Sequence, residues 1–162
     1  MSAFKRILVP VDFTRHSDEA LRVATDMARR YHASLTLVHV LDPLDYAVAE
    51  YESEPNERRR AALSEIDKGL DAAKRQAESS GIGNVRVQSI EGGVSDGIVD
   101  FARRTDCDLI VMGTHGRTGI KRAMLGSVAE AVVRRAECPV LTVKAEKGTE
   151  AERQAGALSS AS

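Results

Sequence analysis

Uninterrupted apolar runs recur along this chain at intervals that leave room for a helix between them. Most of these runs lack alternating polar positions, which is typical of strands buried on both faces of a parallel sheet. The run at residues 85–90 instead alternates apolar and polar positions, which predicts an edge strand with one solvent-facing side. The predicted strands are residues 4–11, 34–40, 85–90, 107–112 and 139–144.

Helical periods fill the intervals between these runs. One helix is expected from about Ser17, and a second carries an apolar stripe from Leu63 to Ala77, with Gly81 as its C-cap. Two shorter helices precede the fourth and fifth strands. The last helix opens with Ser127-Val128-Ala129-Glu130, a capping box in which the serine hydroxyl accepts hydrogen bonds from the helix's own N–H groups.

Strict alternation of strands and helices predicts an α/β fold with one open parallel sheet of five strands. Right-handed crossovers then cover both faces of the sheet with helices. We assign residues 1–145 to this single domain. Residues 42–55 predict a surface excursion with a short helical turn around residues 47–51. Residues 146–162 are small, polar and aperiodic, so a disordered tail is expected there.

The composition fits one soluble globular domain. The chain has 162 residues, of which 43% are hydrophobic and 29% charged, enough for one core. A net charge of −1 gives no general attraction to nucleic acid or to an anionic membrane. No apolar run is long enough for a signal peptide or a membrane span. The two cysteines form neither a disulfide framework nor a metal motif, so a cytoplasmic location is expected.

The segment after the fourth strand is the first candidate for chemistry. A strand that ends in glycines and leads to a helix N-terminus can bind phosphate, because bare N–H groups and the positive end of the helix dipole favour an anion. The loop, residues 114–125, is long for a simple connection. The alternative is a loop without a ligand, in which the glycines form turns and the lysine and arginine side chains are solvated. Its glycines and basic residues are Gly113, Gly116, Gly119, Arg117, Lys121 and Arg122.

Asp12 follows the first strand, at the edge of the sheet where open α/β proteins bind ligands. Its carboxylate can accept a ribose hydroxyl or bind Mg²⁺, and a turn aspartate before the first helix fits the same position. His115, in the glycine loop, is a candidate for a phosphate contact. His39 is expected to pack within the second strand.

Several familiar nucleotide and hydrolase motifs are missing from the sequence. Gly119 is followed by Ile120 rather than by the Lys-Ser/Thr of a Walker A loop. The first strand ends in Pro10-Val11-Asp12 rather than in the glycines of the dinucleotide fingerprint. There is no Gly-x-Ser-x-Gly elbow and no metal-ligand cluster. We therefore expect a binding site and assign no catalytic or metal-ligating residue.

The spacing of the glycines resembles that of the ATP-binding universal stress proteins, which carry Gly-x2-Gly-x9-Gly-Ser/Thr. Gly113, Gly116, Gly126 and Ser127 match this spacing. The segments ILVPVDFT, LVHV, DLIVMGTHGRTG and CPVLTVK resemble the family as well. The similarity extends over nearly the whole chain, from about residue 4 to residue 144.

The resemblance implies a Rossmann-like sheet in the order 3-2-1-4-5, which brings Asp12 beside Gly113. It also implies a site for ATP, or for AMP or ADP, with or without Mg²⁺. Asp12 would bind the ribose, backbone groups of Val40 would contact the adenine, and the glycine loop would enclose the phosphates. The implied binding residues, with Arg117 added because of its charge and position, are Pro10, Val11, Asp12, Val40, Met112, Gly113, His115, Gly116, Arg117, Gly126, Ser127 and Val128.

The function implied by the resemblance is that of a cytoplasmic ATP-binding stress-response protein, a nucleotide-dependent switch or sensor with an unidentified protein partner. Two alternatives stay open: a slow Mg²⁺-dependent ATPase or autokinase, and an interaction module that binds AMP or cyclic AMP. The resemblance further implies a homodimer formed through the last strand, where Val140, Leu141 and Val143 are apolar.

Overall fold

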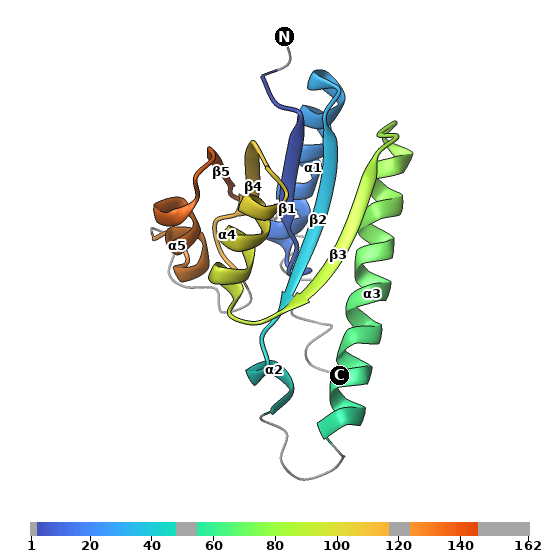
Figure 1. Ribbon diagram of the computed structural model, residues 1–162. Helices are drawn as coiled ribbons and strands as arrows, with labels where there is room; N and C mark the ends of the chain where they lie inside the picture. Colours follow the sequence, from blue (N-terminus) through green and yellow to red (C-terminus); the bar gives the residue numbers. More distant parts are fainter. Residues whose placement is uncertain (1–2, 48–54, 117–123, 146–162) are drawn as a thin grey trace, which may run out of the picture.

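The structure is a computed structural model that describes residues 3–47, 55–116 and 124–145. Strands and helices alternate along the chain, as the sequence predicts (Figure 1). The strands are β1 (Arg6–Pro10), β2 (Ser34–Leu41), β3 (Val85–Glu91), β4 (Leu109–Gly113) and β5 (Val140–Val143). The helices are α1 (Arg15–Tyr31), α2 (Leu44–Ala47), α3 (Pro55–Ser79), α4 (Val94–Arg104) and α5 (Ser127–Arg135).

All strand pairs are parallel, and the sheet has the order β3-β2-β1-β4-β5. This confirms the predicted α/β fold class and the 3-2-1-4-5 order. The central strand is β1, whose Ile7 is in register with Leu35 of β2 and with Leu109 of β4. β3 is an edge strand, and its residues alternate between more and less exposed positions along most of its length, as its sequence pattern predicts.

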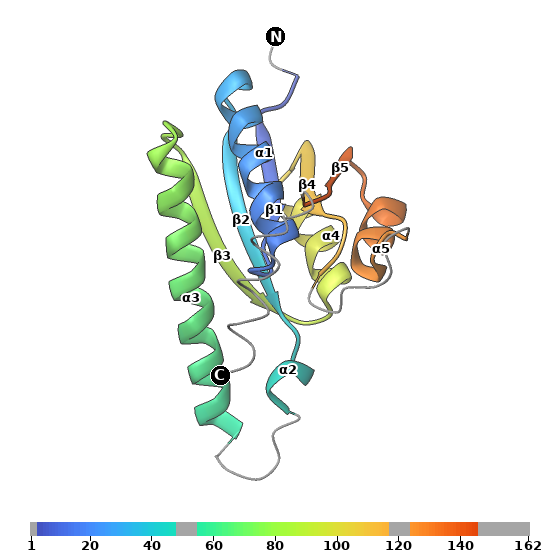
Figure 2. The ribbon, with the colours of Figure 1, turned by 180° about the vertical axis from the view of Figure 1, so that it is seen from behind.

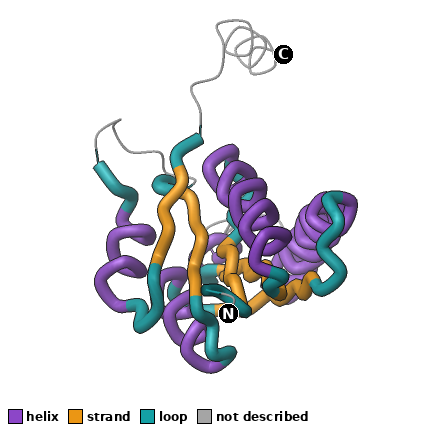
Figure 3. Tube along the Cα trace, turned by 90° about the horizontal axis from the view of Figure 1, so that it is seen from above, coloured by secondary structure: helices purple, strands orange, loops and turns teal. Residues whose placement is uncertain are grey.

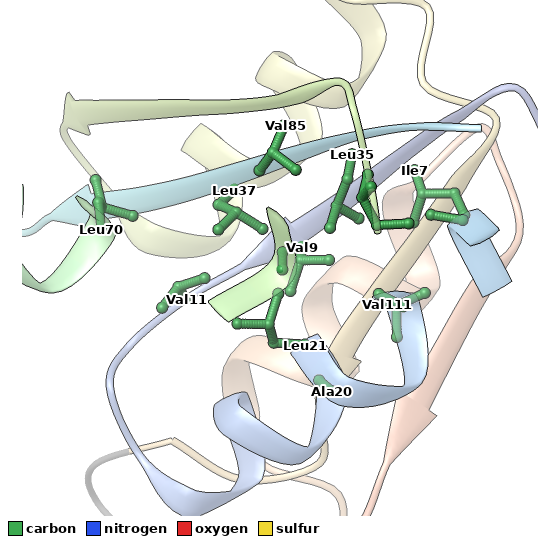
Figure 4. Packing of buried hydrophobic residues seen from close by; sticks show 14 of the residues in the cluster. Ile7, Val9, Val11, Ala20, Leu21, Leu35, Leu37, Leu70, Val85 and Val111 are labelled. Carbon is green, nitrogen blue, oxygen red and sulfur yellow. The ribbon is translucent and has the colours of Figure 1, made fainter. Parts of the chain in front are cut away.

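Helices cover the sheet on both faces, as seen from behind in Figure 2 and from above in Figure 3. α1 and α3 pack on one face, and α4 and α5 pack on the other. Successive residues of the central strand face opposite layers: Ile7 and Val9 join the α1/α3 cluster, and Leu8 joins the α4/α5 cluster. Figure 4 shows the first of these clusters, in which Leu21 of α1 and Leu70 of α3 lie with the strand residues.

Two helix starts differ from the prediction because polar side chains bind the backbone earlier than expected. α1 begins at Arg15 rather than near Ser17, because Thr14 is the N-cap and its hydroxyl accepts a hydrogen bond from the Ser17 N–H. α2 occupies Leu44–Ala47, ahead of the turn predicted at residues 47–51, and the Asp42 carboxylate accepts from the Leu44 N–H (3.0 Å). Residues 48–54 lie outside the described residues.

The end of α3 follows the prediction. The helix stops at Ser79, and Gly81 has a left-handed φ of 92°, the conformation that favours glycine after a helix. In the part of the chain that the structure describes, no helix is both long and apolar enough to span a membrane. The tail predicted at residues 146–162 lies outside the described residues.

Candidate functional site

A cavity lies at the carboxyl ends of β1, β2 and β4. These strands run downwards in Figure 1. The strands β2 and β3 lie on one side of the central strand β1, and β4 and β5 lie on the other, so the strand order reverses beside β1. Open α/β proteins bind ligands at such a switch point. The first turns of α4 and α5 complete the walls of the cavity with Val94, Ile98, Val128 and Ala129.

The structure brings together eleven of the twelve residues that the sequence analysis selected. Arg117 is the exception, because it lies outside the described residues. The selected residues that line the cavity are Pro10, Val11, Asp12, Val40, Met112, Gly113, His115, Gly116, Gly126, Ser127 and Val128.

Asp12 has a structural role and also faces the cavity. Its Oδ1 accepts hydrogen bonds from the backbone N–H of Thr14 (3.0 Å) and from the Thr14 hydroxyl (2.6 Å). Its Oδ2 faces Gly116, where a Cβ atom would lie only 3.0 Å away. The interpretation as a turn aspartate is therefore correct, because Oδ1 stabilises the turn before α1. Oδ2 lies beside the glycine loop, and a ligand contact there stays a prediction.

The other two glycines of the motif are required by the packing of the chain on itself. A Cβ at Gly113 would lie 2.7 Å from the Cβ of His16 and 2.9 Å from its carbonyl carbon, so the end of β4 needs glycine to pass α1. A Cβ at Gly126 would lie 2.9 Å from the carbonyl oxygen of Thr114. The Gly126 N–H donates to that same oxygen (2.8 Å), which joins the two ends of the loop.

The predicted capping box at the start of α5 is wrong. Gly126, and not Ser127, is the N-cap, and no side chain forms a capping hydrogen bond there. The helix starts one residue earlier than a serine cap requires, since the Glu130 N–H bonds to the Gly126 carbonyl (2.8 Å). Ser127 is thus the first helical residue and lines the cavity. The first N–H groups of a helix have no intrahelical partner, so this end of α5 can bind an anion.

Two histidines meet beside the glycine loop. The rings of His16 and His115 are 5.3 Å apart. The Nδ1 atom of His16 accepts a hydrogen bond from the backbone N–H of Ala145 (3.1 Å), which links α1 to the segment after β5. Burial lowers the pKa of His16 from its usual 6.5, His115 and Arg15 lower it further, and Asp12 acts in the opposite direction. His16 was not among the residues predicted from the sequence.

His115 contacts Thr114, with 3.0 Å between its Nδ1 and the threonine hydroxyl. Its Nε2 is buried and has no hydrogen-bond partner among the described residues. A buried polar atom without a partner is costly, and His115 lines the cavity, so Nε2 is a group that a ligand could satisfy.

His39 packs within β2, as predicted, and is only 4% exposed. Its Nδ1 lies 2.6 Å from the carbonyl oxygen of Val11, to which it donates a hydrogen bond. Its ring stacks on Phe13. The pKa of Asp18, in the first turn of α1, is raised above its usual 3.8. The larger cause is burial, and the second is the negative charge of the nearby Asp12 carboxylate.

The model of the universal stress protein family matches residues 3–144, which is nearly the whole described chain. The chain belongs to the universal stress protein family.

Two relatives match over most of their length. Universal stress protein MJ0531 of Methanocaldococcus jannaschii is 37% identical over 149 residues, which cover 89% of this chain and 84% of the relative. "Putative universal stress protein SH1215" of Staphylococcus haemolyticus is 35% identical over 150 residues, covering 91% of this chain and 88% of the relative.

Solved structures agree with the fold of this universal stress protein. Hypothetical protein MJ0577 is similar with a TM-score of 0.78 and 30% identity, over 90% of this chain and 99% of that one. A universal stress protein in complex with cAMP has a TM-score of 0.69 and 25% identity, over 90% and 100% of the two chains. One from Archaeoglobus fulgidus in complex with dAMP has a TM-score of 0.62 and 25% identity, over 89% and 100%.

The cavity of this universal stress protein also contains residues that the sequence analysis missed. The helical period places Val94 and Ile98 on the inner face of α4, but nothing in that period says that they reach a cavity. The described residues contain no group of three or more His, Cys, Asp or Glu side chains that could hold a metal ion. The remaining lining residues are Ser17, Val38, His39, Asp42, Asp45, Val94, Ile98, Thr114 and Ala129.

Proposed function

We propose that this universal stress protein binds ATP in the cavity at the carboxyl edge of its sheet and acts as a nucleotide-dependent regulatory switch. The observation that carries the proposal is that one cavity is lined by Asp12, by the start of the glycine loop at residues 114–116 and by the uncapped N-terminus of α5. These are the groups that a ribose and a phosphate chain need.

The apolar part of the cavity suits a flat base. Val40, Met112, Val94, Ile98 and Val128 contribute carbon-rich surface on the side of α4 and α5. An aromatic base buried among such side chains leaves water, which favours binding. We assign the adenine to this end, next to Val40.

The polar part of the cavity suits the sugar and the phosphates. We assign the ribose hydroxyls to Oδ2 of Asp12, because Oδ1 is already engaged by Thr14. We assign the phosphates to the first turn of α5, with Ser127, to Gly116 and to Nε2 of His115. The two similar proteins solved with cAMP and with dAMP support an adenine nucleotide as the ligand class.

The switch follows from the position of the site. A nucleotide in this cavity would contact β1, α4 and α5 at once, so its binding can favour one arrangement of these elements over another. The partner that responds to this change is, in our proposal, another protein.

Isothermal titration calorimetry on nucleotide-free protein tests this proposal, with ATP, AMP and cAMP as separate ligands. We expect ATP to bind, and we expect Gly116→Val to weaken it at least about tenfold, because a side chain there would meet Asp12 and fill the approach to the loop. Gly83→Val is the matched control, since a Cβ at Gly83 meets no atom within 4 Å.

Three outcomes of this titration would count against the proposal. Absence of heat with every nucleotide would refute nucleotide binding. Stronger binding of cAMP than of ATP would indicate that cAMP, and not ATP, is the ligand of this cavity. Equal affinities of the wild type and Gly116→Val would refute the assignment of the glycine loop.

A further inference from the structure

Phe13, the residue after Asp12, has a backbone conformation that few non-glycine residues adopt. Its φ is 63°, in the left-handed region. A bulky residue remains in such a conformation only where its surroundings hold it, and such residues concentrate at functional sites. The contacts of the Phe13 ring show what holds it.

The ring lies between β2 and α3, on the face of the sheet opposite α4 and α5. It stacks on the ring of His39, with 5.1 Å between centroids and 22° between planes. The ring also contacts α3 at Gly69, in the middle of that helix. A Cβ atom at Gly69 would lie 2.5 Å from Cε1 and 2.8 Å from Cζ of Phe13. Glycine inside a helix is unfavourable, and at this position it provides a notch for the ring.

The segment that carries Asp12 is held by further bonds. His39, which stacks on Phe13, also donates from Nδ1 to the carbonyl oxygen of Val11. The Val11 N–H donates to the Val38 carbonyl (2.8 Å), and the Asp12 N–H donates to the Ser17 hydroxyl (3.2 Å). Phe13 therefore belongs to a set of contacts that leaves the adjacent Asp12 little freedom.

We propose that Phe13 is a positioning residue, whose ring in the Gly69 notch holds the Asp12 carboxylate in the orientation that binds the ribose. The ring itself does not line the cavity and acts through the chain. This inference rests on the proposed function, because it concerns the same nucleotide and the same carboxylate.

Gly69→Ala tests the proposal from a position outside the cavity. The added methyl group fills the notch, so the ring and the loop that carries it must move. We expect ATP to bind about tenfold more weakly, the effect of losing one hydrogen bond to a charged group. Alanine favours helix more than glycine does, so an effect on α3 alone would not weaken binding. Gly83→Ala is the matched control and should bind ATP like the wild type.

A nucleotide without ribose hydroxyls provides the specific measurement. For 2′,3′-dideoxy-ATP there is no hydroxyl for Asp12 to bind, so Gly69→Ala should leave its affinity unchanged. Phe13→Leu, which lacks Cε1 and Cζ, should recover part of the ATP affinity when combined with Gly69→Ala. Circular dichroism checks that each variant is folded. If Gly69→Ala does not fold, Phe13→Leu alone must weaken ATP more than the dideoxy analogue.

The outcomes separate this inference from the proposed function. If wild-type protein binds neither nucleotide, the proposed function fails and the positioning role fails with it. If the wild type binds ATP and Gly69→Ala binds it equally well, only the positioning role is refuted. Equal weakening of ATP and of the dideoxy analogue would also refute it, because the loss would not pass through the ribose.

Discussion

Gly113, Gly116 and Gly126 belong to one sequence motif for three different steric reasons. Gly113 lets the end of β4 pass the backbone of His16, and Gly126 lets the loop close on Thr114. Only Gly116 is constrained by Asp12, a residue of the cavity. The sequence suggests that this motif is a phosphate loop. Two of its three glycines are also required by the packing of the chain.

His16 illustrates a residue whose importance depends on contacts that are distant in the sequence. The spacing of apolar residues along α1 gives no reason to predict His16 as a site residue. Its hydrogen bond to Ala145 joins residues that are 129 positions apart in the chain, and its contact with His115 is also with a distant segment. A pattern read along one segment could not reveal either contact.

The lowered pKa of His16 predicts how stability depends on pH. The folded protein disfavours the charged ring, so the unfolded state binds the proton more readily. The free energy of unfolding should therefore decrease as the pH falls below about 6.5, towards the folded-state pKa. Protonation of Nδ1 would also remove the acceptor for the Ala145 N–H.

Urea unfolding at pH about 7.5 and about 5.5 measures this effect. His16→Gln should lose less stability between the two pH values than the wild type does. The control is His32→Asn, because His32 is exposed at the left-handed C-cap of α1, a conformation that asparagine tolerates. An identical pH dependence in wild type and His16→Gln would contradict the prediction.

At the scale of elements, the order of strands and helices was predictable, and the residues at which they start and end were predictable only to within a few positions. Continuous apolar runs identified β1, β2, β4 and β5, and the alternation of apolar and polar residues identified β3 as an edge strand. The residue at which a helix starts depends on local contacts that the helical period does not show. Thr14 caps α1 and Gly126 precedes α5, where the sequence suggested Ser17 and Ser127 as the starting points.

Ser127→Ala follows from the correction at the start of α5. The hydroxyl does not cap the helix, so the free energy of unfolding should change by less than about 0.5 kcal/mol, rather than by the ~1 kcal/mol that loss of a cap costs. If the hydroxyl binds phosphate, ATP affinity should fall several-fold. Thermal unfolding and calorimetry measure the two effects, with Ser64→Ala on the exposed surface of α3 as the control.

A stability loss of about 1 kcal/mol in nucleotide-free Ser127→Ala would restore the capping interpretation. Unchanged ATP affinity would remove Ser127 from the phosphate site while leaving the rest of the cavity assignment in place.

For the whole molecule, the parallel sheet leaves two edges, β3 and β5. An unpaired edge strand can pair with a second copy of the chain. β5 has an apolar sequence, and the Leu141 side chain is 38% exposed. We therefore keep the prediction of a homodimer through Val140, Leu141 and Val143.

Leu141→Asp should disrupt this dimer. In a two-fold interface the same position occurs in both copies, so the substitution puts two like charges into one apolar contact. Light scattering at micromolar concentration should give a dimeric mass for the wild type and a monomeric mass for the variant. Val133→Asp, an exposed apolar position on α5, controls for added charge. A monomeric wild type would contradict the prediction.

The sequence by itself determined the fold class, the approximate strand positions and eleven of the residues that line the cavity at the carboxyl edge of the sheet. Period and apolar continuity are local properties, and the glycine spacing identified the family. Only the tertiary structure decided how each residue is used: that one oxygen of Asp12 is engaged by Thr14, that Ser127 does not cap α5, and that Phe13 occupies a notch at Gly69. These depend on distances of a few ångströms between atoms whose positions are set by the packed sheet, loops and helices, and no pattern along the chain encodes them.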